Sequence, residues 1–234
     1  MTINLTAFSD RTALVETVSD CIHSVLKGAL EVRSTALMAL SGGNTPMPIY
    51  SRLAGMDLDW SRVIGLPSDE RWVPTDHQAS NYREITRQFS DCGISLESLT
   101  PAKASGRADP RHAIKVLTSL PPTFDLVLLG MGGDGHFASL FPGSPALAAG
   151  LDTAGREQAL AVVPDPLPPE APHERITLSL SKLMATRHLI LVITGQAKHE
   201  ILKQAARPGA DPNQLPVAAL LRAAGERLTI YWSP

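Results

Sequence analysis

The stretch that most constrains the fold runs from Phe124 to His136, where an apolar segment meets a glycine-rich turn. Residues 124–129 have the almost continuous apolar character of a parallel strand that is buried on both faces. Four glycines within six positions then allow positive φ angles and close approach of a ligand to the main chain: Gly130, Gly132, Gly133 and Gly135. Ligands of open α/β sheets bind beyond the carboxyl ends of strands, so Asp134 and His136 are the first candidates for a site.

This turn does not fit a dinucleotide-binding motif. Its spacing is close to G-x-G-x-x-G, but Asp134 and His136 interrupt the part that would hold a pyrophosphate, and no clear helix opens directly after it. A glycine-rich turn can also be a plain connection between a strand and a helix. A function for this turn therefore depends on what the neighbouring strand ends contribute.

Short apolar segments alternate with amphipathic ones, which predicts an α/β fold. Strands are expected at residues 35–40, 63–67, 124–129, 159–163, 176–180 (half-exposed), 188–193 and 228–232. Helices are expected after Asp10, Pro46 and Ser80 and, briefly, after Ser181, while the proline-rich segment 164–172 is expected to be irregular. We expect a single domain over residues 1–234, with a Rossmann-like, doubly wound, mostly parallel sheet flanked by helices.

Composition and charge exclude several classes of protein. The 44% of hydrophobic residues can form a sizeable core without disulfides or metals, and a net charge of −2 offers no footprint for nucleic acid. No apolar run is long enough to span a bilayer, and the N-terminus lacks the pattern of a signal peptide. Cys21 and Cys92 are far apart and lie near no histidine pair, which predicts neither a disulfide nor a metal site. These features together predict a protein of the reducing cytoplasm.

The segment after the expected strand 35–40 predicts an anion site. It combines free backbone amides, two hydroxyl groups and the positive end of the helix expected after Pro46. The residues concerned are Ser41, Gly42, Gly43, Asn44 and Thr45. Phosphate is the obvious ligand, and the alternative is a capped turn without a ligand, because asparagine and threonine often cap helices.

Charged side chains follow two further strands. Arg71 could bind a phosphate through its guanidinium fork, and Asp69 or Glu70 could orient sugar hydroxyls or the arginine itself. The alternative for Glu70 is a solvated loop with a surface ion pair. Lys198 stands in the first turn of a helix, against the helix dipole, so we expect it to meet an anion; the alternative is a solvated helix lysine.

Four strand ends thus offer polar groups to one pocket. Two cations and a helix terminus suit a phosphate, and His136 supplies an imidazole, the side chain whose ordinary chemistry suits proton transfer near neutrality. This combination predicts an enzyme that acts on a phosphorylated small molecule without a metal.

These motifs, in this order, resemble those of the 6-phosphogluconolactonases, within the glucosamine/galactosamine-6-phosphate isomerase superfamily. The matching segments are 40–43, 68–71 with 73–74, 80–83, 130–136 with 138–143, 175–178 and 195–198. The resemblance covers nearly the whole chain. It implies hydrolysis of 6-phospho-D-glucono-1,5-lactone to 6-phosphogluconate in the pentose phosphate pathway, a Rossmann-like parallel sheet and no cofactor. Phe137 departs from the usual threonine of the family and Asn44 from its usual serine.

A mechanism follows as a hypothesis from these groups. The substrate phosphate would bind the amides of residues 41–45 between Arg71 and Lys198, and neutral His136 would take a proton from the attacking water. Amides of the glycine turn, Gly132 and Gly133 among them, are candidates to stabilise the oxyanion. Either Asp69 or Asp134 could hold the imidazole tautomer, and the sequence does not choose between them.

Two alternatives remain open. Amino-sugar-phosphate deaminase-isomerases share the Gly-Asp-Gly-His turn, but they typically continue with Asn-Glu-Pro-Gly where this chain has Leu140-Phe141-Pro142-Gly143. A sugar-phosphate sensor without catalysis would usually carry a DNA-binding extension, for which there is neither room nor a basic patch. The expected partner is a small sugar-phosphate lactone, with no nucleic acid and no membrane, and the chain is expected to be a monomer or a weak homodimer.

Overall fold

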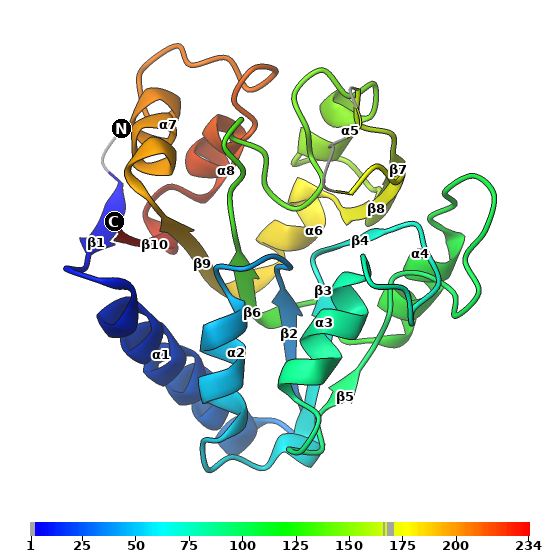
Figure 1. Ribbon diagram of the computed structural model, residues 1–234, viewed down its shortest axis with the longest axis vertical. Helices are drawn as coiled ribbons and strands as arrows, with labels where there is room; N and C mark the ends of the chain where they lie inside the picture. The colour runs from blue at the N-terminus through cyan, green and yellow to red at the C-terminus, as the bar shows by residue number, and fades with distance from the viewer. Residues whose placement is uncertain (1–2, 166, 168–170) are drawn as a thin grey trace.

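The computed structural model describes residues 3–165, 167 and 171–234, and its centre is a seven-stranded parallel sheet (Figure 1). Its strands are β1 (Asn4–Ala7), β2 (Ala36–Leu40), β3 (Val63–Pro67), β5 (Ser95–Leu96), β6 (Phe124–Leu129), β9 (Thr186–Thr194) and β10 (Leu228–Ser233). Their order is β1-β10-β9-β6-β2-β3-β5. The chain winds one way from β2 to β3 and β5, and the other way from β6 to β9 and β10. The switch between β2 and β6 opens a crevice at the carboxyl ends of the strands.

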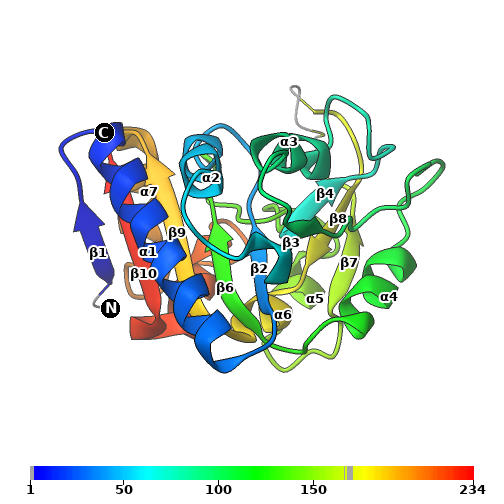
Figure 2. The ribbon, with the colours of Figure 1, turned by 90° about the horizontal axis from the view of Figure 1, so that it is seen from below.

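Helices cover both faces of this sheet, which confirms the predicted fold class (Figure 2). The helices α1 (Arg11–Val32), α2 (Met47–Ala54) and α3 (Asn81–Gln88) share one core. The helices α4 (Arg111–Ser119), α5 (Leu147–Leu151), α6 (Leu180–Met184), α7 (Gln196–Ala205) and α8 (Val217–Ala224) share the other. Along β6, Leu126 and Leu128 enter the first core while Val127 and Leu129 enter the second, as alternation along a strand requires. None of the helices in the described ranges has both the length and the apolar character needed to cross a membrane.

A second, antiparallel sheet was not expected. It has three strands in the order β4-β8-β7: β4 (Asp69–Arg71), β8 (Arg175–Leu178) and β7 (Ala159–Val162). The sequence predicted a loop at 69–71, but antiparallel pairing with β8 makes it a strand. The strand predicted at 176–180 was expected to be half-exposed, yet all four residues of β8 are buried. Alternation suggested a solvated face, whereas β8 lies between two strands and packs against the chain that follows His136.

Two of the four predicted helix starts are confirmed by their caps. The Asp10 carboxylate accepts a hydrogen bond from the Ala13 amide, and the Ser80 hydroxyl accepts one from the Arg83 amide. The short helix α6 is capped by Ser179 rather than by the predicted Ser181. Edge strands β1 and β5 and the 3₁₀ turns Trp60–Arg62 and Gly225–Arg227 had no prediction. Of the irregular segment predicted at 164–172, residues 166 and 168–170 lie outside the described residues.

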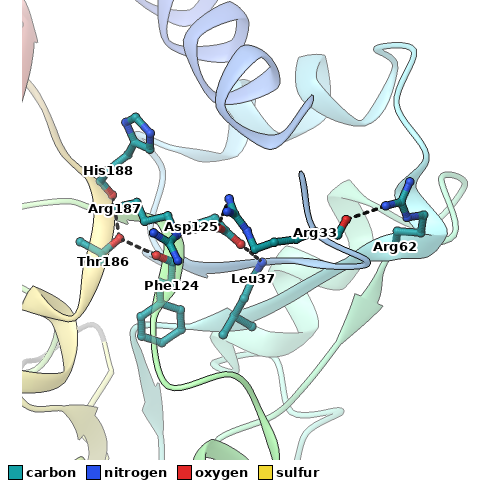
Figure 3. A network of polar contacts seen from close by, with 8 residues as sticks. All are labelled: Arg33, Leu37, Arg62, Phe124, Asp125, Thr186, Arg187 and His188. Atoms are coloured by element: carbon teal, nitrogen blue, oxygen red, sulfur yellow. Dashed lines mark hydrogen bonds and ion pairs between the residues drawn. The ribbon is translucent and has the colours of Figure 1, made fainter. Parts of the chain in front are cut away.

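The amino ends of the central strands are joined by a buried carboxylate (Figure 3). Asp125, in β6, accepts a hydrogen bond from the Leu37 amide of β2 at 2.9 Å. Its other oxygen lies 2.7 Å from the Arg33 guanidinium and 3.4 Å from that of Arg187. Arg62 in turn donates to the carbonyl of Arg33 and so holds the end of α1. This network ties α1, β2, β6 and β9 together at the end of the sheet away from the glycine turn.

Candidate active site

A cavity of about 320 Å³ opens at the carboxyl ends of β2, β4, β6 and β9. It contains most of the residues that the sequence singled out: Ser41, Gly42, Gly43, Asn44, Thr45, Asp69, Arg71, Gly132, His136 and Lys198. Pro46, Asn81, Gly130, Met131, Ala138 and Val192 complete its lining. Segments that are far apart in the chain therefore meet at the crevice that the switch in strand order predicts.

The loop after β2 presents a row of free amides to this cavity. The Ser41 amide continues the sheet by donating to the Leu128 carbonyl at 3.0 Å. Within the described part of the chain, the amides of Gly42, Gly43, Asn44 and Thr45 have no protein acceptor. Gly43 has a φ of 89°, a left-handed conformation that glycine adopts without strain. Four free amides ahead of α2, which begins after Pro46, are an anion-binding arrangement.

Two cations flank this loop. Arg71, at the end of β4, donates to the Ala79 carbonyl at 2.7 Å, and this bond holds its guanidinium at the cavity. Lys198 lies half-buried in the first turn of α7. Burial and the nearby Arg11 lower the pKa of Lys198, and the charge of Asp134 only partly opposes this effect. The ammonium therefore lacks a full counter-charge of its own, which suits it to an incoming anion.

His136 brings an imidazole into the same cavity as the anion loop. Its Nδ1 lies 2.5 Å from Oδ1 of Asp134, and its ring packs against Phe141 at 4.2 Å between centroids. Burial opposes the charge on Asp134, but the hydrogen bonds from the ring and amide of His136 outweigh it and lower the pKa of that carboxyl. A carboxylate at Nδ1 holds the proton there and leaves Nε2 with its lone pair. The structure thus pairs Asp134, rather than Asp69, with the imidazole.

The main contribution of the glycine turn is space for the His136 ring, because few of its amides are free. A side chain at Gly132 would place its Cβ 2.2 Å from Cε1 of His136, so only glycine lets the imidazole lie there. The Gly132 amide donates to the His136 carbonyl at 2.8 Å, and the Gly135 amide donates to the Gly132 carbonyl at 3.2 Å. Both amides are therefore engaged within the turn. Gly133 and Asp134 are exposed and do not line the cavity.

Asp69 and Glu70 have different surroundings from those predicted. Asp69 lines the cavity and accepts hydrogen bonds from the hydroxyls of Ser139 at 2.5 Å and Ser68 at 3.3 Å. Glu70 is fully buried and does not line the cavity, so the predicted solvated loop with a surface ion pair is wrong. The other prediction, that Glu70 orients the arginine, agrees with the bond from the Arg71 amide to its carboxylate at 2.7 Å. Its carboxylate accepts bonds from three amides and one hydroxyl, those of Arg71, Asn81, Tyr82 and Ser80. Burial nevertheless raises the pKa of Glu70.

Sequence reasoning also missed residues that support the site. Asn81 was interpreted only as a helix start, yet it lines the cavity and its side-chain amide donates to the Asp69 carbonyl at 2.8 Å. Ser139 is fully buried and holds Asp69. Phe137 points into the hydrophobic core, so its replacement of threonine changes packing and not the cavity wall. In the ranges that the structure describes, no three His, Cys, Asp or Glu side chains gather as a possible metal site.

Comparisons with known proteins give a consistent result. The family model of glucosamine-6-phosphate isomerases/6-phosphogluconolactonase matches residues 9–231. A 6-phosphogluconolactonase of Rhizobium meliloti is 35% identical over 237 residues, covering 100% of both chains. One of Pseudomonas putida is 36% identical, covering 97% of this chain and 91% of its own. The crystal structure of a 6-phosphogluconolactonase from Shewanella baltica matches with a TM-score of 0.90 and 31% identity, covering 100% of this chain and 98% of that one.

Proposed function

The chain belongs to the family of glucosamine-6-phosphate isomerases and 6-phosphogluconolactonases, and from this premise we propose that it is a 6-phosphogluconolactonase. The reaction is the hydrolysis of 6-phospho-D-glucono-1,5-lactone to 6-phospho-D-gluconate. The observation that carries the proposal is one cavity lined by both a row of free amides and an imidazole that is paired with a carboxylate. The amides suit the phosphate, and the imidazole suits the activation of water.

Binding of the phosphate sets the position of the ring. The phosphate accepts hydrogen bonds from the amides of residues 42–45 and lies between the charges of Arg71 and Lys198. Ser41 and Thr45 lie in the same wall, and their hydroxyls, which bond to the Gly42 carbonyl and to the Thr194 hydroxyl in the free protein, turn to the phosphate on binding. Anchoring one end of the substrate in this way holds the lactone carbonyl within reach of His136 and lowers the entropic part of the barrier.

Hydrolysis then proceeds by general base and general acid catalysis. Nε2 of His136 takes a proton from water, and the resulting hydroxide attacks C1 to form a tetrahedral oxyanion. Collapse of this intermediate breaks the bond between C1 and the ring oxygen, and the imidazolium returns its proton to that oxygen. Asp134 holds the Nδ1 proton throughout and stabilises the imidazolium. The new carboxyl group ionises as the product forms.

The oxyanion needs hydrogen-bond donors, and the turn leaves few. The Gly132 and Gly135 amides are engaged, whereas those of Met131 and Gly133 have no protein acceptor in the described part of the chain. Of these two residues, Met131 lines the cavity. We therefore assign the Met131 amide as the first candidate donor and Gly133 as the second.

The proposal includes metal independence, a cytoplasmic location and a monomeric or weakly dimeric state. Positioning and one base suffice for an activated ester such as a δ-lactone, and the site offers the positive charge of Arg71 and Lys198 in place of a metal ion. Cys21 and Cys92 are free thiols, which fits a reducing compartment. A chelator should therefore leave the rate unchanged.

The test is a coupled assay in which glucose-6-phosphate is oxidised in situ to supply fresh lactone at slightly acid pH, where spontaneous opening is slow. We expect His136→Asn to lower kcat between about a hundred- and ten-thousandfold, with KM nearly unchanged, because only proton transfer is lost. His112→Asn, on α4 outside the cavity, is the matched control and should keep full activity. Near-normal turnover by His136→Asn would refute the base assignment.

The same assay separates the alternatives. A deaminase-isomerase would turn over glucosamine-6-phosphate, and a sensor would bind sugar phosphates without hydrolysing the lactone. The sequence Leu140-Phe141-Pro142-Gly143 argues against the deaminase, because Phe141, which packs on the His136 ring, stands where those enzymes typically have a glutamate. No acceleration of lactone opening by the wild-type protein would overturn the proposal as a whole.

A further inference from the structure

The residues after His136 form a tight turn that contains an unfavourable backbone conformation. The Leu140 amide donates to the Phe137 carbonyl at 3.1 Å, and these two residues pair as an antiparallel bridge. Ala138 and Ser139 are therefore the central residues of the turn. Ala138 has a φ of 46°, and among the described residues it is the one non-glycine residue with a positive φ. This pattern is that of a type II′ turn, whose first central position favours glycine. An alanine there is strained and must be held by its surroundings.

Ser139 makes two hydrogen bonds that hold this turn. Its hydroxyl donates to Oδ2 of Asp69 at 2.5 Å, and its amide donates to Oγ1 of Thr177 at 3.1 Å. Asp69 and Thr177 are paired residues of β4 and β8, so each strand contributes one side chain to the contact. Ser139 and Thr177 are fully buried, which keeps water from competing for these bonds. The turn is thus anchored to the three-stranded sheet at a single residue.

This anchor follows His136 by three residues in the chain. Ala138 lines the cavity beside His136, whereas Phe137 and Leu140 enter the hydrophobic core. On the N-terminal side, the ring and amide of His136 are held by Asp134, and its carbonyl is held by the Gly132 amide. The turn is the contact that holds the backbone on the C-terminal side.

We propose that Ser139 is a positioning residue for His136. Its two bonds keep Ala138 in the left-handed conformation, and this conformation sets the direction in which the imidazole enters the cavity. The proposal rests on the proposed function of His136 as the base. It concerns a different question, namely which residue sets the orientation of the His136 ring. Loss of the Ser139 hydroxyl should therefore reduce turnover and leave phosphate binding intact, because the anion loop belongs to β2 and α2.

Three variants test this proposal. Ser139→Ala removes the bond to Asp69. We expect kcat to fall between about ten- and a hundredfold, because a small displacement of the imidazole from its reacting position lowers the rate by this much. KM should stay within about twofold, because the phosphate contacts remain. The double variant Ala138→Gly with Ser139→Ala should recover part of the lost kcat, since glycine adopts a positive φ without strain. Ser144→Ala removes another buried hydroxyl outside the cavity and is the control expected to keep full kcat.

A second readout separates this proposal from the proposed function. Histidine ¹⁵N spectra of the folded variants should show a changed His136 signal in Ser139→Ala and its partial return in the double variant. Absence of lactonase activity in the wild type would refute the proposed function, while the spectra would still report the position of the ring. Wild-type kcat and an unchanged His136 signal in folded Ser139→Ala would overturn the positioning role. A rise in KM at constant kcat, or no recovery in the double variant, would overturn it as well.

Discussion

Lys198 shows how its neighbours set the charge of a single residue in this site. It lies in the first turn of α7, where the positive end of the helix is unfavourable for a cation. Arg11, whose guanidinium donates to Thr194 at 2.9 Å, adds a second positive charge nearby. Burial and this repulsion lower the pKa of Lys198. A bound phosphate would compensate for both the burial of the ammonium and its repulsion by Arg11. The charged form of Lys198 is therefore less stable in the free protein than in the complex with an anion.

The pH dependence of product binding should reveal the lowered pKa of Lys198. The cationic form of Lys198 binds phosphate, and its fraction falls as the pH rises through a pKa that is lower than usual. Affinity for 6-phosphogluconate should therefore weaken at a lower pH than the value of about 10.4 for an ordinary lysine would suggest. Lys198→Arg should extend binding to higher pH, because a guanidinium stays charged.

Calorimetric titration of the product from neutral to alkaline pH checks this prediction. Lys203→Arg is the matched control, since Lys203 lies on the same helix and pairs with Glu200 at the surface. Parallel pH profiles for the wild type and Lys198→Arg would show that Lys198 does not contribute its charge to the phosphate.

At the scale of elements, β4 and α3 are joined through one carboxylate. Glu70 belongs to β4, and its two oxygens accept hydrogen bonds from the first amides of α3 and from the Ser80 hydroxyl that caps this helix. A helix N-terminus needs such acceptors, and a negative charge there is favourable. Arg71 follows directly, so the same contact positions the cation at the cavity.

Glu70→Gln should destabilise the protein and weaken substrate binding. A glutamine has one acceptor oxygen in place of two and turns an NH₂ group toward buried donors, which costs about 3 kcal/mol in the free energy of unfolding. KM should rise because Arg71 loses its fixed neighbour. Urea denaturation and lactonase kinetics measure both effects. Glu84→Gln makes the same change on the surface of α3 and should cost far less. Equal stability of the two variants would contradict this role.

At the scale of the whole molecule, the two ends of the parallel sheet have different tasks. The carboxyl ends carry the cavity, while the amino ends carry the Asp125 network (Figure 3). Asp125 is shared by Arg33 and Arg187 and accepts the Leu37 amide. Four elements depend on this carboxylate, and none of its partners lines the cavity.

Asp125→Ala should therefore lower stability without changing catalysis. The change leaves the buried Leu37 amide without its acceptor, which costs about 1–3 kcal/mol in the free energy of unfolding. The side chains of Arg33 and Arg187 are 35% and 52% exposed, so water solvates their charges and the lost ion pairs add at most about 1 kcal/mol. Asp20→Ala breaks the exposed pair with Arg52 and should cost at most about 1 kcal/mol. Denaturant midpoints give the stabilities, and kcat of the folded proteins gives the control. A large loss of kcat in folded Asp125→Ala would show that the two ends are coupled.

The sequence by itself determined most elements and the site's main components. Continuous apolar segments such as 124–129 predict buried strands, and caps such as Asp10 and Ser80 predict helix starts, because these signals involve residues close together in the chain. The glycines and the polar residues after β2 and β6 could be assigned to one crevice, since parallel strands deliver their ends to one edge.

Only the tertiary structure decided how these components pair. It joined Asp134 to His136, buried Glu70 under α3, and turned 69–71 into a strand by pairing it with β8. The Ser139 contact joins residues 70 positions apart. Local patterns carry no information on such partners, because a buried carboxylate and a solvated one look alike in a sequence until the chain that covers them is known.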